Sequence, residues 1–199
     1  MKKLLIFLAV IVVIGFLIYK PVVGFNNTAV EYEANAKTAW SNVESSYQRR
    51  NDLIGNLIKT VQGAADFERT TLREVIEARA KATSTTIDAS NITPENIAQF
   101  QQAQSGLTGA LSKLLVSVER YPELKANQNF LELQSQLEGT ENRINIARDK
   151  YNEKVNIYDI HTTKFPGKIL AGWFGFEEMP RYKADAGSEK APDVNFDFK

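Results

Sequence analysis

Cysteine is absent from the 199 residues of this chain, and histidine occurs only once, at His161. Without cysteine the chain has no disulfide, thiolate nucleophile, thiolate metal site or lipidated cysteine. A single histidine also excludes the paired Glu-x-x-His motifs that bind two metal ions inside helical bundles. We therefore expect no metal ion and no organic cofactor. His161 should bond the last carbonyl groups of its helix or face solvent.

Acidic residues are missing from the first part of the chain: none precedes position 21, where Lys2, Lys3 and Lys20 are found. The whole chain carries 24 basic and 24 acidic side chains, so the part after these lysines is slightly acidic. Such a part lacks the basic surface that nucleic-acid-binding proteins use. We therefore expect no nucleic-acid partner.

A continuous apolar segment, Leu4–Tyr19, lies between these lysines. As a helix it is about 24 Å long, and it approaches the ~30 Å of a bilayer core if Lys20 extends its amine to the headgroups. We expect Leu4–Val23 to cross a lipid bilayer as a retained anchor. A cleaved signal peptide is the alternative, but no Ala-x-Ala site follows. Two lysines before the segment against one after it predict a cytoplasmic N-terminus and a domain outside the inner (cell) membrane.

After the anchor, apolar residues recur every three or four positions and no stretch alternates as a strand does, which predicts an all-α fold. Asn26, Asn27 or Thr28 would cap a first helix that reaches about Thr83. A second helix would start at Thr93-Pro94, with Thr93 as its cap. The last would run from about Asn127 to Thr163, with a seven-residue repeat typical of a bundle. Its members are Phe130, Leu137, Ile144, Tyr151, Tyr158 and Phe165.

Gly55 decides how the first of these helices is arranged. An unbroken helix to Thr83 would be about 85 Å long, whereas a break between Asn51 and Gly63 gives two pieces that match the later helices. The break predicts an antiparallel, up-down four-helix bundle over residues 26–166. A glycine costs a helix only about 1 kcal/mol, so continuity through Gly55 stays open. Residues 1–25 would then be the transmembrane anchor, and 167–199 an apolar segment with a mobile tail.

Charged residues on the apolar faces are the candidates for a site. We interpret them as structural ion pairs that fix the register of the helices. The candidates are Arg49 or Arg50 with Glu138 or Glu141. Paired carboxylates at Glu138 and Glu141 would be the catalytic alternative. We favour ion pairs and expect no enzyme.

The apolar segment Leu170–Phe176 follows two lysines. Tryptophan and lysine suit the boundary between membrane and water, whereas the alternative is that the segment covers the open end of the bundle. The candidates for contact with a membrane or a partner are Trp173, Phe174, Phe176, Lys164 and Lys168.

Several blocks of this sequence resemble the LemA family, in order and over nearly the whole chain. The resemblance implies an N-terminal transmembrane segment and an antiparallel four-helix bundle, without established catalytic residues. A relative in magnetosome-forming bacteria suggests a role in membrane organisation. The family usually has proline where this chain has Gly55. The blocks are Ala39–Val43, Gln48–Leu57, Glu77–Arg79, Tyr121–Asn127, Leu137–Ile144 and Tyr151-Asn152 leading to Phe165-Pro166.

These observations favour a membrane-anchored helical scaffold or interaction protein of the bacterial envelope, with an envelope protein as its unidentified partner. A component of envelope-stress sensing or signalling is the second hypothesis, which a pocket of convergent polar groups between helices would favour. An enzyme using Glu138 and Glu141 is the third and weakest, and it requires two carboxylates that converge on an open cleft.

Overall fold

The computed structural model describes residues 2–63 and 67–183 of the chain. Within them the regular elements are all helices, which confirms the all-α prediction. The expected mobile tail, 184–192, lies outside the described residues. The helices are α1 (Lys2–Gln62), α2 (Arg69–Ser84), α3 (Pro94–Val118), α4 (Pro122–Lys125), α5 (Gln128–Thr163) and α6 (Gly167–Phe174).

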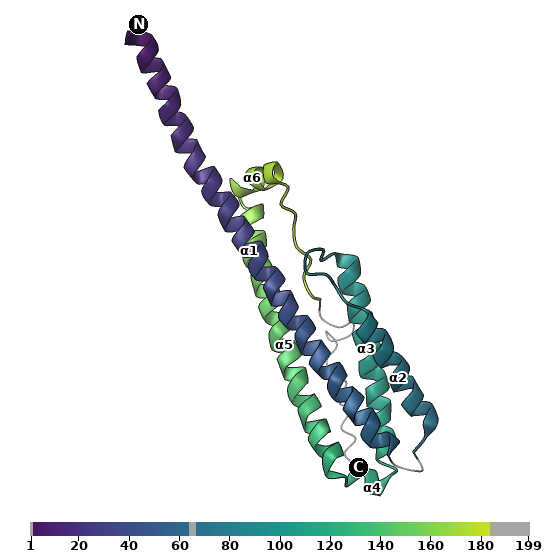
Figure 1. Cartoon of the computed structure of the whole chain (residues 1–199). Coiled ribbons are helices and arrows are strands. Elements are labelled where there is room, and N and C mark those ends of the chain that lie inside the picture. The colour runs from purple at the N-terminus through teal and green to yellow at the C-terminus, as the bar shows by residue number, and fades with distance from the viewer. Residues whose placement is uncertain (1, 64–66, 184–199) are drawn as a thin grey trace, which may run out of the picture.

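The helix α1 joins the apolar N-terminal segment to the bundle without interruption (Figure 1). Its first part projects beyond the other helices and contains an 18-residue window of mean hydropathy 2.6, none of it buried. By length and composition this part is a candidate membrane span. Pro21 lies inside α1, where its missing N–H deprives the Leu17 carbonyl of its usual helical partner.

The predicted separate helix start at Asn26, Asn27 or Thr28 is wrong, because α1 passes through these residues. Phe25 and Ala29, on either side of them, are buried against the rest of the protein. Burial of this helical face stabilises continuity more than a capping side chain would stabilise a new start. The boundary between anchor and bundle therefore lies within one helix.

Four helices form an antiparallel, up-down bundle (Figure 1). The helix α1 leads away from the N-terminal end, α2 returns, α3 leads away again and α5 comes back. α1 packs along α5, and α2 packs along α3. The prediction of four segments is confirmed, but the break comes later than Gly55, because α1 continues to Gln62.

Gly55 serves the packing of α2 on α1. A Cβ at this position would stand 2.8 Å from Nη2 of Arg79, so only glycine lets the guanidinium lie this close to α1. The Nε of Arg79 donates a hydrogen bond to the Asn51 carbonyl at 2.7 Å. The cost of glycine in the helix, about 1 kcal/mol, is offset by burial of neighbours such as Leu57.

The caps and core of the later helices follow the sequence pattern closely. The side chain of Thr93 accepts a hydrogen bond from the Asn96 N–H at 3.2 Å, and Asn127 caps α5 in the same way through Phe130. The seven-residue repeat of α5 is buried from Phe130 to Tyr158. It fails at Phe165, which is 83% exposed because α5 ends two residues earlier.

The return segment, Glu177–Lys183, runs back along the bundle after α6 (Figure 1). Its Tyr182 is buried, with the hydroxyl 2.7 Å from the hydroxyl of Tyr47. Backbone carbonyls of the segment accept hydrogen bonds from the hydroxyls of Tyr151, at 2.7 Å, and Tyr158, at 2.8 Å. Burial raises the pKa of Tyr158 to about 12. The segment therefore belongs to the core, although the sequence interpretation treated it as the start of a tail.

Candidate binding surfaces

Arg50 links three helices from the middle of the bundle, with its side chain only 6% exposed. On α3, its Nη2 donates to Gln104 Oε1 at 2.8 Å, and its Nη1 lies 3.3 Å from the hydroxyl oxygen of Thr108. On α5, Nη1 lies 3.2 Å from Oε2 of Glu141, whose side chain is 48% exposed. The ring of Tyr47 lies 4.9 Å from the guanidinium carbon. This arrangement holds α1, α3 and α5 in register.

Of the four ion-pair candidates, the structure brings together Arg50 and Glu141. Arg49 and Glu138 are exposed, and the carboxylate of Glu138 accepts a hydrogen bond from Gln134 on its own helix at 3.4 Å. The two glutamates thus have separate partners, one across the bundle and one along α5. Within residues 2–63 and 67–183, no group of three His, Cys, Asp or Glu side chains is placed to hold a metal ion.

His161 fastens the end of α5 to α1. Its ring stacks on Phe25 at 4.5 Å and meets the edge of Tyr32 at 5.4 Å. Its Nε2 lies 3.2 Å from the carbonyl oxygen of Phe25. The expectation that His161 bonds the carbonyls of its own helix or faces solvent is therefore wrong. The two helices pack side by side here, so the imidazole lies between them.

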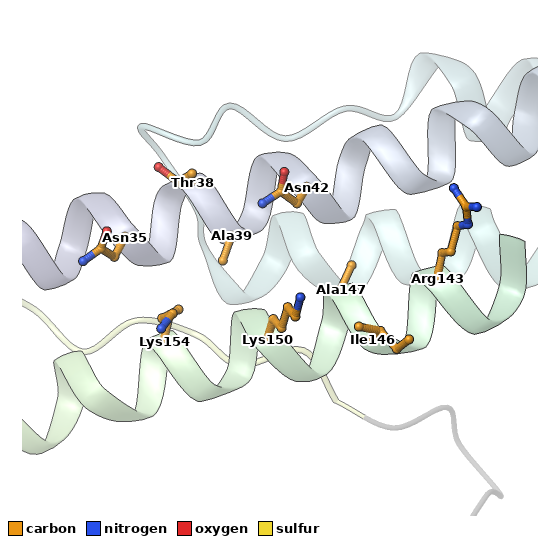
Figure 2. A pocket seen from close by; sticks show the side chains of 9 residues that line it. All are labelled: Asn35, Thr38, Ala39, Asn42, Arg143, Ile146, Ala147, Lys150 and Lys154. Carbon is orange, nitrogen blue, oxygen red and sulfur yellow. The ribbon is translucent and has the colours of Figure 1, made fainter.

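A groove of about 390 Å³ follows the junction of α1 and α5 (Figure 2). The helix α5 supplies its cations, and α1 supplies amides and a hydroxyl. Figure 2 shows Lys150 extending from α5 toward α1, with Lys154 about one turn further along α5. Among the described residues, none that line the groove is a carboxylate. The lining residues are Asn35, Thr38, Ala39, Asn42, Arg143, Ile146, Ala147, Lys150 and Lys154.

The charges of this groove are unbalanced. Lys150 and Lys154 are four residues apart on one helix face, where like charges repel by about 0.2–0.5 kcal/mol. The ion pairs found within the described part of the chain do not include either lysine or Arg143. A bound anion would relieve the repulsion and accept hydrogen bonds from the amides of α1. The groove is therefore suited to an anionic group.

The short helix α6 crosses the end of the bundle beside α1 (Figure 1). One face packs inward, where Ala171 is buried with Phe25 and Ala29, and Phe176 adds an edge-on contact with Phe25 at 6.4 Å. The other face is open: Trp173 is 75% exposed and Phe174 is 45% exposed. The inner face of α6 thus covers the end of the bundle, as one alternative from the sequence expects, whereas contact of the open face with a membrane or a partner stays a prediction. Lys164 and Lys168 are exposed beside it.

Glu44 fastens the connection between α2 and α3 to α1. Its Oε1 accepts a hydrogen bond from the Ile87 N–H at 3.0 Å. Desolvation raises the pKa of the Glu44 carboxyl above its ordinary value, and the Ile87 N–H offsets part of the shift. Ionisation of Glu44 therefore lowers the free energy of unfolding, so the stability of the fold depends on pH.

We expect Glu44→Gln to flatten this pH dependence. Below the ordinary pKa of 4.5 the carboxyl is protonated in the folded and the unfolded state. As the pH rises through the higher pKa of the folded state, the proton is lost and the free energy of unfolding falls. The substituted amide keeps an acceptor for the Ile87 N–H but cannot ionise. Urea unfolding between about pH 4 and pH 7 should show the free energy of unfolding of the variant rising relative to that of the parent as the pH increases. A difference between the two that does not change with pH would contradict this.

The apolar first part of α1 projects beyond the bundle, and the exposed apolar face of α6 lies beside it (Figure 1). These features are those of a membrane-associated helical protein. The chain belongs to the LemA family, whose model matches residues 39–196. It is 24% identical to Protein LemA of Metamycoplasma hominis, over 86% of this chain and 71% of that protein.

The chain is also similar to magnetosome proteins. It is 26% identical to Magnetosome protein MamQ 1 and MamQ 2 of Paramagnetospirillum magneticum, over 79% of this chain and 64% of each relative. It is 26% identical to Magnetosome protein MamQ of Magnetospirillum gryphiswaldense, over 78% of this chain and 63% of that protein. The chain thus spans a little under two thirds of the length of these MamQ relatives.

Proposed function

We propose that this chain is a non-enzymatic scaffold of the bacterial envelope that holds a binding surface at a fixed position above the inner membrane. The continuity of α1 carries the proposal. The same helix contributes the candidate span and, from Phe25 to Val61, one wall of the core. With α5 packed along it as far as Phe25, the bundle follows the direction in which α1 leaves the span.

The proposed topology has the N-terminus in the cytoplasm and the bundle outside it. The support is the charge distribution around the span, with Lys2 and Lys3 before it and Lys20 after it. Positive residues are retained on the cytoplasmic side of membrane segments.

The groove between α1 and α5 is the surface that we propose for the partner, which would present an anionic segment. A photo-crosslinking residue at Ile146, which lines the groove and is 47% exposed, should give a defined adduct in native membranes. Reversing the charge of the groove with Lys150→Glu and Lys154→Glu should reduce that adduct several-fold, because attraction becomes repulsion. The measurement is the yield of the adduct, followed by identification of the partner by mass spectrometry.

The matched control places the same residue at Val116, which is 72% exposed on α3 and outside the groove. The same adduct from both positions, or a yield indifferent to charge reversal, would overturn the groove as the partner site. The convergent polar groups of the groove also favour ligand sensing as a second function. No adduct at Ile146, together with a melting temperature that rises with the concentration of inorganic phosphate, would support sensing instead.

A further inference from the structure

The open face of α6 is apolar and continuous. Within α6, Ile169 and Trp173 are four residues apart, a spacing that places their side chains on one side of the helix. They are 50% and 75% exposed, Phe174 adds a further ring beside them, and Phe165, which precedes α6, is 83% exposed. The opposite side of α6 is already packed against Phe25 and Ala29. A helix that is apolar on both sides needs a second partner for the open one.

The position of this face identifies that partner. The buried contacts of α6 on α1 are at Phe25 and Ala29, which follow the expected end of the span at Val23 by about 3 and 9 Å of helix. The headgroup region on each side of a bilayer core is about 5–8 Å thick. The open face of α6 is therefore at the depth of the interface.

The flanking charges agree with that position. Lys164 and Lys168 are exposed next to the apolar face, where their amines would meet anionic headgroups. Tryptophan is enriched at this depth because its ring is apolar while its N–H is polar. Val116 is also exposed, but it lies in the last turn of α3, away from the span (Figure 1).

We propose that α6 enters the interface of the same membrane that α1 crosses, with Ile169 and Trp173 among the lipid chains and headgroups. The occupant of the open face is thus the lipid surface. The bundle is then attached to the membrane at two points, through the span and through α6. This inference rests on the anchor of the proposed function, but it does not depend on the groove or its partner.

Fluorescence quenching of Trp173 by brominated phospholipids tests the proposal. The full chain is placed in vesicles containing anionic lipid, with bromine either near the headgroup end or near the tail end of the acyl chains. We expect most of the Trp173 emission to be quenched, and more strongly by the shallow bromines. Trp173→Phe supplies the baseline, since Trp40 is fully buried in the core.

Two further tryptophans, each in the Trp173→Phe background, make the result decisive. Val10→Trp lies in the span and should be quenched, which separates failure of the anchor from failure of the α6 contact. Val116→Trp lies near the end of α3 that leads to α4, away from the span, and should not be quenched (Figure 1). Quenching of Val10→Trp without quenching of Trp173 would overturn the proposal. That result combined with protection of Trp173 from aqueous quenchers would mean that a second copy or another protein covers the face.

Discussion

Replacing Arg50 by alanine is expected to lower the free energy of unfolding by about 3 kcal/mol, since buried charged pairs cost several kcal/mol to break. The guanidinium is almost fully buried, and its loss removes the donors that satisfy Gln104 and Thr108 on α3. Glu141→Ala is expected to lower the free energy of unfolding by about 2 kcal/mol. The loss is smaller because the carboxylate is half exposed and because the buried Arg50 cation would still donate to Gln104. Urea unfolding of the full chain in detergent, followed by circular dichroism, measures both.

A paired variant separates charge from packing. Arg50→Met with Glu141→Gln comes close to the volume of both side chains and removes the ion pair, so it should recover the part of the Arg50→Ala loss that comes from packing and from the stranded carboxylate. The part that comes from the lost donors to Gln104 and Thr108 should remain. If neither single alanine variant changed the unfolding curve, the pair would not be structural. A functional role for these charges would then gain support.

Gly167→Ala is expected to release α6 from the bundle while leaving the rest of the core folded. A Cβ at this position would overlap the carbonyl oxygen of His161 and stand 2.9 Å from Cε2 of Phe25. The first of these is backbone and cannot rotate away. Overpacking of this kind costs about 1–3 kcal/mol, enough to speed amide exchange in α6 by roughly 5- to 150-fold. Hydrogen exchange followed by mass spectrometry reads this directly.

Gly172→Ala is the matched control, because a Cβ there meets no atom within 4 Å. It should leave the exchange of α6 unchanged or slower, since alanine favours a helix more than glycine does. Equal exchange in the two variants would contradict the role assigned to Gly167. In vesicles, Gly167→Ala should also weaken the quenching of Trp173 by brominated lipid.

The sequence predicted those parts of the fold in which local pattern and packing agree. The caps at Thr93 and Asn127 and the buried repeat of α5 follow from hydrogen-bonding chemistry and helical periodicity alone. The helix start near Asn26 was predicted wrongly, because Asn and Thr are good caps only where the preceding turn has no packing of its own. At Phe25 it has such packing, provided by residues more than a hundred positions away.

The surfaces were predictable only in part, for a similar reason. The charge pattern placed Arg50 and Glu141 among four candidates, but the choice between them depends on which turn of α5 faces α1. The groove escaped the sequence interpretation because Lys150 and Lys154 alone resemble an ordinary solvated helix face. Only the fold shows that Asn35 and Asn42 of α1 lie opposite them.

The return segment was missed because Tyr182 pairs with a hydroxyl 135 residues earlier. The signal in the sequence for this segment was the set of tyrosines on the apolar helix faces, because a buried tyrosine hydroxyl needs a hydrogen-bond partner.

Gly55 illustrates how one contact can restrict the residue type at a helical position. A proline there would lack the N–H that the Asn51 carbonyl accepts in a regular helix. Arg79 donates to that carbonyl from α2, but a Cβ at position 55 would stand 2.8 Å from Nη2 of Arg79. The side chain that could replace the lost donor is therefore the one that a proline would displace.

The unbroken α1 also makes the bundle a lever. From Gly24 to Gln62 the helix extends about 57 Å beyond the span, and a span that is too long for a thin bilayer tilts to bury its apolar length. A tilt of about 10° would carry the far end of the bundle sideways by roughly 10 Å. A difference in bilayer thickness of a few ångströms would thus become a lateral movement large enough to bring a neighbouring protein into or out of reach.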